Sequence, residues 1–256
     1  MNPFSLQPDN IHLYYTCLDK IRDQRLIDQY LGILSPAESI TISKIRSEKK
    51  RHESLVSKAL ARFVLSRCCR IPPEAVQYCV NRHGKPALMP GVTPVPVRFN
   101  LSHCKDLVGC AVTWDADVGI DMEDQHRGVN LNLARRFFSE PEIMQLEKIK
   151  DTAGRQAMFL QLWTLKEAYI KAVGKGLSMG LDKFSFVFDQ GRPDIRFVSE
   201  KAKTAGIWHF FSLTLLNRYT VAAGVRSGNA KRPDIHIYAC IPFDSIQSQV
   251  MIPYLR

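Results

Sequence analysis

The sequence lacks the features that place a chain in a membrane or in an oxidising compartment. No apolar run approaches the roughly 20 residues of a membrane-spanning helix, and residues 1–15, which include Pro3, Asp9 and Asn10, lack the apolar core of a signal peptide. The seven cysteines form an odd count without a Cys-x-x-Cys pair, which favours reduced thiols. We therefore expect a cytoplasmic protein without a membrane partner.

Low-complexity tracts, internal repeats and nucleic-acid-binding motifs such as a Cys-His finger are also missing. The composition is that of a globular protein, with 256 residues of which 45% are hydrophobic and 23% charged, and this length leaves one or two domains open. Its 35 Lys and Arg exceed its 25 Asp and Glu, so the net charge of +10 predicts an anionic partner. Charge alone does not choose among nucleic acid, acidic protein, anionic membrane and phosphorylated ligand.

Residues 119–123 have the sequence Gly-Ile-Asp-Met-Glu. Ile120 and Met122 alternate with small or polar residues, which is the period of a half-buried strand, so Asp121 and Glu123 point to the same side. Two carboxylates this close repel each other, and hard oxygen ligands of this kind suit Mg²⁺ bound to substrate phosphates. An isolated Asp-x-Glu is more often a solvated strand face, so the interpretation as a metal site needs a second motif.

Residues 158–172 supply that motif. They lack Gly and Pro and carry apolar residues at three-to-four spacing, which predicts a largely buried helix that ends near Gly174. On this helix Trp163, Glu167 and Lys171 share one face. An exposed Glu-Lys pair at this spacing would contribute only about 0.2–0.5 kcal/mol, whereas a buried pair is costly unless it has a task or further partners.

Helices precede strands in both halves of the sequence, which predicts an α+β fold. We expect a basic amphipathic helix over residues 48–70 that stops at Pro72-Pro73, and two further helices near residues 131–137 and 140–149. The expected strands lie at residues 75–80, 107–114, 184–188, 196–199, 208–216 and 219–223, the last with an extension to Val225.

Four further motifs accompany the Asp-x-Glu strand and the Trp163 helix. They are His-Gly-Lys-Pro at 83–86, Phe-Asn-Leu-Ser-His at 99–103, Phe-Phe-Ser at 137–139 and Gly-Lys-Gly-Leu at 174–177. In this order and spacing, the six motifs resemble the 4′-phosphopantetheinyl transferases. The long chain is similar to the surfactin-synthetase-activating type and not to the short trimeric type that serves fatty-acid synthesis. The clear resemblance runs from about residue 52 to residue 188.

The resemblance implies two similar α+β lobes in a pseudo-twofold arrangement, with the active site in the cleft between them. The N-terminal lobe would cover residues 1–116 and bind coenzyme A. The C-terminal lobe would cover residues 117–256 and hold the magnesium-binding and catalytic residues. A chain of this length could contain a complete cleft as a monomer.

The implied activity is the transfer of the phosphopantetheine arm of coenzyme A to a serine of an apo acyl or peptidyl carrier protein, with release of adenosine 3′,5′-bisphosphate. Asp121, Glu123 and Glu167 would hold Mg²⁺ against the pyrophosphate. Glu167 would act as metal ligand, as base for the serine proton, or as both, and the sequence leaves this open. Lys171 would stabilise charge on the pyrophosphate oxygens and contact coenzyme A, so Asp121, Glu167 and Lys171 are the expected catalytic residues.

The resemblance places four residues at coenzyme A: Arg51, Lys85, Ser102 and His103. Lys85 would bind a phosphate, and the Ser-His pair would contact the 3′-phosphate and the adenine-side ribose. The match around Arg51 is loose, because Glu53 stands where the family often has arginine. Four further basic residues are unranked alternatives for the 3′-phosphate pocket: Arg46, Lys49, Lys50 and Arg62.

The implied partner is an acidic carrier protein of fatty-acid, polyketide or nonribosomal-peptide synthesis, and no nucleic-acid partner is expected. Residues 130–138, which include Arg135 and Arg136, are either a docking surface for it or a helix with a solvated basic face. Two other classes of function stay open. One is a magnesium-dependent nuclease or nucleic-acid phosphotransferase, suggested by the acidic residues and the net charge; the other is a non-catalytic module that binds carrier domains.

Overall fold

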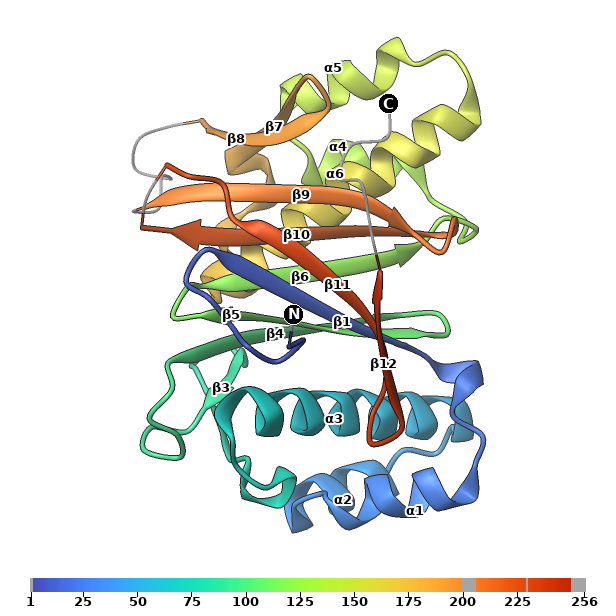
Figure 1. Cartoon of the computed structure of the whole chain (residues 1–256). Coiled ribbons are helices and arrows are strands. Elements are labelled where there is room, and N and C mark those ends of the chain that lie inside the picture. Colours follow the sequence, from blue (N-terminus) through green and yellow to red (C-terminus); the bar gives the residue numbers. More distant parts are fainter. Residues whose placement is uncertain (1, 199–205, 229, 250–256) are drawn as a thin grey trace. The chain divides into compact units, whose positions relative to one another are not determined.

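The computed structural model (Figure 1) describes residues 2–198, 206–228 and 230–249, which fold into two compact units. The first unit contains the described residues of three segments: Met1–Asn81, Pro86–Ala116 and Asp234–Met251. The second unit contains the described residues of Arg82–Lys85 and Asp117–Pro233.

A five-stranded sheet forms the centre of the first unit, in the order β12-β11-β1-β5-β4. Its strands are β1 (Asn10–Cys17), β4 (Val97–Cys104), β5 (Leu107–Trp114), β11 (Asp234–Ile241) and β12 (Ser245–Gln249). β1 pairs with β5 antiparallel and with β11 parallel, so that His12 lies opposite both Val112 and His236. Strands from the two ends of the chain therefore share one sheet.

The chain passes between the units at both ends of the segment Arg82–Lys85, at Ala116 and again at Pro233. The expected C-terminal lobe of residues 117–256 differs from this division in its last segment. The apolar residues of this last segment can mark a strand, but they do not identify the strand with which it pairs. In the structure β11 pairs with β1, so this segment belongs to the first unit. The segment Arg82–Lys85, expected in the N-terminal lobe, belongs to the second unit.

Three helices complete the core of the first unit: α1 (Gln24–Gly32), α2 (Pro36–Ser43) and α3 (Glu48–Cys69). The face of α3 that carries Val56, Leu60 and Val64 is fully buried, and α3 packs against β4 and β5. Arg70 ends α3 in the left-handed conformation, with φ of 56°. The connecting elements are 3-10 turns at Leu18–Lys20 and Pro73–Ala75 and the hairpin of β2 (Tyr78–Val80) and β3 (Pro86–Leu88).

The second unit is built on a three-stranded antiparallel sheet in the order β6-β10-β9. Its strands are β6 (Val118–Asp124), β9 (Ile207–Leu215) and β10 (Tyr219–Ser227), and the long helix α6 (Thr152–Val173) packs against β6 and β10 (Figure 1). The helix begins at Asp151, whose side chain accepts from Gly154 N, and ends at Gly174, whose φ of 71° suits glycine.

Smaller elements surround α6. They are α4 (Ala134–Phe137), α5 (Glu140–Lys148), the hairpin of β7 (Phe184–Asp189) and β8 (Arg192–Phe197), and 3-10 turns at Leu131–Leu133, Gly176–Met179 and Leu181–Lys183. Tyr169 of α6 lies at the centre of their aromatic core, with its ring 4.8 Å from that of Phe184 and 4.9 Å from that of Trp208. This core fixes the face of α6 that is turned away from the acidic residues.

The prediction of an α+β fold is confirmed, and the expected helices over residues 48–70 and 158–172 are α3 and part of α6. The strand expected at 75–80 is shorter, because residues 73–75 form a 3-10 turn. The strand expected at 196–199 is the end of β8, and Ser199 lies outside the described residues. Among the helices described, none has the length and apolar character needed to cross a membrane. The pseudo-twofold relation of the lobes and the cleft between them stay predictions.

Candidate active site

The close approach of α6 to β6 creates the candidate site. A Cβ atom on Gly119 would overlap Ala168 O and Ala172 N of α6, so only glycine allows the strand and helix to lie this close. Asp121 and Glu123 follow Gly119 at alternate positions and lie on the same face of β6. The contact therefore brings both acids next to the part of α6 that carries Glu167 and Lys171.

Asp121 and Lys171 form a direct link between the two elements. Lys171 Nζ donates to Asp121 Oδ1 at 2.6 Å, and the Asp121 side chain is largely buried. A short charge-assisted hydrogen bond in a partly desolvated place is stronger than an exposed ion pair. Lys171 is thus not the solvated helix-surface residue that the i,i+4 spacing alone would allow.

Glu123 lies in the same cluster and pairs with Arg127, whose Nη1 is 2.9 Å from Glu123 Oε1. Burial raises the pKa of Glu123 to about 7, and the charges of Asp121 and Glu167 raise it as well. Arg127 and Lys171 act in the opposite direction. The carboxylate therefore changes its charge near neutral pH.

Glu167 completes the group of three acids. Burial raises its pKa, the charge of Asp121 raises it further, and Lys171 lowers it. The effects of Asp121 on Glu167, and of both acids on Glu123, arise because these carboxylates lie close together. The structure thus brings together the four residues predicted for metal binding and catalysis.

The donor set of this cluster suits a hard divalent cation such as Mg²⁺, because nearby negative charge raises the pKa of Glu123 and of Glu167, and such carboxylates gain most from added positive charge. Among the described residues, however, no three His, Cys, Asp or Glu side chains are arranged to hold a metal ion. In this arrangement Asp121 and Glu123 instead face the cationic groups of Lys171 and Arg127. The magnesium site therefore stays a prediction.

A second charged pair, Lys166 and Glu142, lies next to the site and was not predicted. Both side chains are 0% exposed, and Lys166 Nζ lies 2.7 Å from Glu142 Oε2. Lys166 also donates to Leu181 O and Phe184 O, each at 2.7 Å. Glu142 accepts from Ser139 N and Phe186 N as well, so the pair joins α5 and β7 to the residue that precedes Glu167.

Lys85 has a structural role in addition to the phosphate contact expected of it. Its Nζ donates to Val118 O at 3.1 Å and to Ala172 O at 2.8 Å, which ties the start of β6 to the end of α6. The preceding Gly84 has φ of 86°, as expected for a tight turn that needs glycine. Lys85 thus lies at the ends of the same two elements that carry the acidic cluster.

The remaining residues predicted for coenzyme A lie in the first unit. Ser102 is buried in β4, His103 is exposed, and Arg51 is exposed on α3. His103 Nε2 lies 3.3 Å from Glu53 Oε1, so an acidic side chain of α3 faces the predicted histidine. The structure therefore links β4 and α3 at this point. Coenzyme A binding by Arg51, Ser102 and His103 stays a prediction.

Arg62, one of the unranked alternatives for the 3′-phosphate, has its charge satisfied inside the first unit. It is 2% exposed, and its Nη2 donates to Glu38 Oε2 at 2.6 Å. Its Nη1 also donates to Pro73 O. Arg62 is therefore a core residue that orients α2 and α3. Lys49 pairs with Asp106 at 2.8 Å on the surface.

The predicted docking stretch of residues 130–138 forms a 3-10 turn followed by α4. Phe138 is buried against Phe159, whereas the Arg136 guanidinium lies over the Phe137 ring at 5.1 Å. Arg135 forms a long ion pair, with its Nη2 3.7 Å from Glu147 Oε1. A basic face and a buried aromatic end thus occur together, and both interpretations of this stretch stay open.

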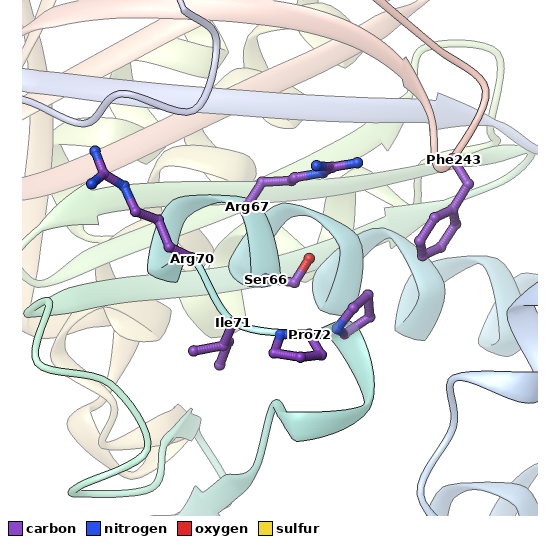
Figure 2. A pocket seen from close by; sticks show the side chains of 7 residues that line it. Ser66, Arg67, Arg70, Ile71, Pro72 and Phe243 are labelled. Carbon is purple, nitrogen blue, oxygen red and sulfur yellow. The ribbon is translucent and has the colours of Figure 1, made fainter.

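A pocket of about 500 Å³ lies in the first unit, between the end of α3 and the turn that carries Phe243 (Figure 2). Arg67 and Arg70 extend beside it, and Ile71 and Pro72 form part of its wall (Figure 2). None of the predicted site residues lines this pocket. Basic residues in a last helical turn stabilise the negative end of the helix dipole, which explains the two arginines without a ligand.

Two family models match most of the chain. Residues 117–223 match the model described as the 4′-phosphopantetheinyl transferase superfamily, and residues 23–115 match the one described as 4′-phosphopantetheinyl transferase, N-terminal. Together these ranges include every residue predicted for the site.

Individual relatives are similar over much of their length. The chain is 31% identical over 175 residues to 4′-phosphopantetheinyl transferase Sfp of Bacillus subtilis (strain 168), which covers 68% of this chain and 75% of the relative. It is 29% identical over 210 residues to 4′-phosphopantetheinyl transferase HetI of a Nostoc species, covering 82% and 84%. It is 33% identical over 188 residues to 4′-phosphopantetheinyl transferase psf-1 of Bacillus pumilus, covering 72% and 77%.

Proposed function

The chain belongs to the 4′-phosphopantetheinyl transferase superfamily, and on this premise we propose that it moves the phosphopantetheine arm of coenzyme A onto a serine of an apo carrier protein. Adenosine 3′,5′-bisphosphate is the second product. The observation that carries the proposal is the cluster of Asp121, Glu123, Glu167 and Lys171, which the contact at Gly119 assembles from β6 and α6.

The transfer exchanges one phosphorus–oxygen bond for another. The serine oxygen forms a bond to the phosphorus that carries the pantetheine arm, and the bond from that phosphorus to the bridging oxygen of the pyrophosphate breaks. The serine proton leaves to a base or to water. Positioning and neutralisation of charge supply most of the rate in reactions of this kind.

Asp121, Glu123 and Glu167 would hold the Mg²⁺ ion. When bound, this ion would neutralise charge on the pyrophosphate and hold it in place as a Lewis acid. Glu167 has a raised pKa, which matches it better to accepting the serine proton than an ordinary carboxylate. Lys171, held in place by Asp121, would offer its ammonium group to the pyrophosphate oxygens.

Coenzyme A would also be bound by Arg51, Lys85, Ser102 and His103. Lys85 is held near the ends of β6 and α6 by its hydrogen bonds to Val118 O and Ala172 O, and a bound phosphate would be its further partner. An ammonium group has three donors and can serve several acceptors at once.

The partner would be an acidic acyl or peptidyl carrier protein. A net charge of +10 supports this proposal, because opposite charges accelerate encounter and this acceleration falls with added salt. Residues 130–138, with Arg135 and Arg136, would contribute to the docking surface. We expect the enzyme to act as a cytoplasmic monomer, without nucleic acid or membrane.

The proposal is tested by intact-protein mass spectrometry of apo acyl and peptidyl carrier domains incubated with this protein, coenzyme A and Mg²⁺. We expect one carrier serine to gain one phosphopantetheine, and we expect EDTA to prevent the gain. Carrier binding without any gain would favour the non-catalytic module. Metal-dependent cleavage of DNA or RNA, with no response to coenzyme A, would favour the nuclease instead.

A further inference from the structure

The ion pair between Arg127 and Glu123 joins a partly exposed side chain to a largely buried one. The Arg127 side chain is 39% exposed, whereas that of Glu123 is 14% exposed. The main chain of the turn is held in place, because Arg127 N donates to Asp124 O at 3.0 Å and Gln125 N donates to Arg218 O at 2.9 Å. The guanidinium can therefore leave Glu123 by a change of side-chain rotamer, with no change in β6.

Arg127 is the counter-ion of Glu123 inside the acidic cluster. Lys171 is engaged with Asp121, and the nearby charges of Asp121 and Glu167 both act on Glu123. Without Arg127, the charges of Asp121 and Glu167 would be opposed at Glu123 by Lys171, which is already paired with Asp121. A neighbouring guanidinium relieves this repulsion in the same way as a bound cation would.

The guanidinium and a divalent cation would compete for the same carboxylate group, that of Glu123. Arg127 Nη1 lies 2.9 Å from Glu123 Oε1, and a magnesium ion would have to approach a Glu123 oxygen to about 2.0–2.1 Å. Two positive groups cannot both occupy that position without repelling each other. Binding of the cation would thus displace the Arg127 side chain from Glu123.

We propose that Arg127 is a built-in competitor of the divalent cation, which occupies Glu123 in the free enzyme and sets the affinity of the site for the ion. The inference rests on the proposed role of the acidic cluster and adds a residue to it. Arg127 acts through Glu123 and is therefore a positioning residue. Removal of its charge should strengthen cation binding.

The test measures Mn²⁺ binding to the full-length protein by electron paramagnetic resonance, without coenzyme A. Arg127→Gln should bind Mn²⁺ about three- to tenfold more tightly than the wild type, because the cation no longer has to break the ion pair. Arg127→Lys, which keeps the charge, should resemble the wild type. Measurement at pH 8.5, above the pKa of about 7 of Glu123, limits competition by protons.

Arg196→Gln is the matched control, because it removes one positive charge from an exposed position on β8 in the same unit. It should leave the affinity for Mn²⁺ unchanged. The inference would be overturned if Arg127→Gln bound Mn²⁺ no more tightly than the wild type, or if Arg196→Gln showed the same gain. It would also be overturned if neither Arg127→Gln nor the wild type bound Mn²⁺.

The outcome can be separated from that of the carrier assay. Tighter Mn²⁺ binding by Arg127→Gln with no modification of any carrier would support the competition and contradict the proposed activity. Carrier modification without the gain in affinity would contradict the competition alone.

Discussion

Gly119 of β6 lies directly against Ala168 of α6, at a distance that leaves no room for a side chain. This contact places the strand that carries Asp121 and Glu123 on the helix that carries Glu167 and Lys171. Gly119 thus brings these four residues together without contributing a functional group of its own. Glycine is required here for the close approach of two elements and not for a special backbone angle.

Gly119→Ala is therefore expected to push β6 and α6 apart. The added methyl group would meet main-chain atoms of α6, which cannot move aside as a side chain does. We expect a loss of about 1–3 kcal/mol in the free energy of unfolding and a larger proportional loss of transfer rate. Urea unfolding and the carrier assay measure the two effects. The control is Gly228→Ala, where nothing lies within 4 Å of the added atom. Equal losses of stability and rate in the two variants would contradict the role of Gly119 in the contact between β6 and α6.

Lys166→Met should destabilise the second unit by about 3–5 kcal/mol, because it leaves the buried carboxylate of Glu142 without its cation. The measurement is urea unfolding followed by tryptophan fluorescence, with the exposed Lys148→Met as the control. A combined Lys166→Met and Glu142→Gln variant should lose less stability than the sum of the two single changes. An additive result would show that the two residues do not depend on each other.

Glu123→Gln should stabilise the protein at pH 8 when no divalent cation is present. The folded-state pKa of Glu123 is about 7 and its ordinary value is 4.5, so the folded state holds the proton more tightly. Wild-type stability is therefore lost as the pH rises from about 4.5 to 7, and the variant avoids this loss. The advantage should be small at pH 4.5 and about 1–2 kcal/mol at pH 8, once solvent screening is allowed for.

Thermal unfolding of the wild type and of Glu123→Gln between pH 4.5 and pH 8 measures this difference in stability. The control is Glu147→Gln, which changes an exposed residue of α5. A constant difference at all pH values would contradict the raised pKa. Added Mg²⁺ should reverse the order at pH 8, because the wild type keeps the third carboxylate.

The local patterns of the sequence predicted the elements of the site well. Alternation around Asp121 predicted β6, and the helical spacing around Glu167 predicted the central part of α6 and its end at Gly174. These patterns also placed each pair of charged residues on one face. They do not predict that the two faces meet, because that depends on the contact between Gly119 and Ala168.

The features that the sequence did not predict depend on contacts between distant segments. Lys166 looks like one more polar residue of a helix, and only the fold shows that Glu142 and two carbonyl groups surround it. Ser139 and Glu142 form the capping box at the start of α5, and this local contact does not reveal the buried pair with Lys166. β1, β11 and β12 were missed for a related reason, since a strand is stabilised by partners that its own residues do not identify.

The central claim is that the acidic cluster performs phosphopantetheine transfer, and the most direct test is the initial rate at which an apo carrier domain gains phosphopantetheine. The experiment compares three proteins at saturating coenzyme A and Mg²⁺: the wild type, Asp121→Asn and the control Asp189→Asn. The control changes an exposed residue at the end of β7. We predict that Asp121→Asn lowers the rate by about 100-fold or more while the control keeps it, because the cluster acts by placing charge around the reacting phosphate. A full rate in a folded Asp121→Asn variant would contradict the account.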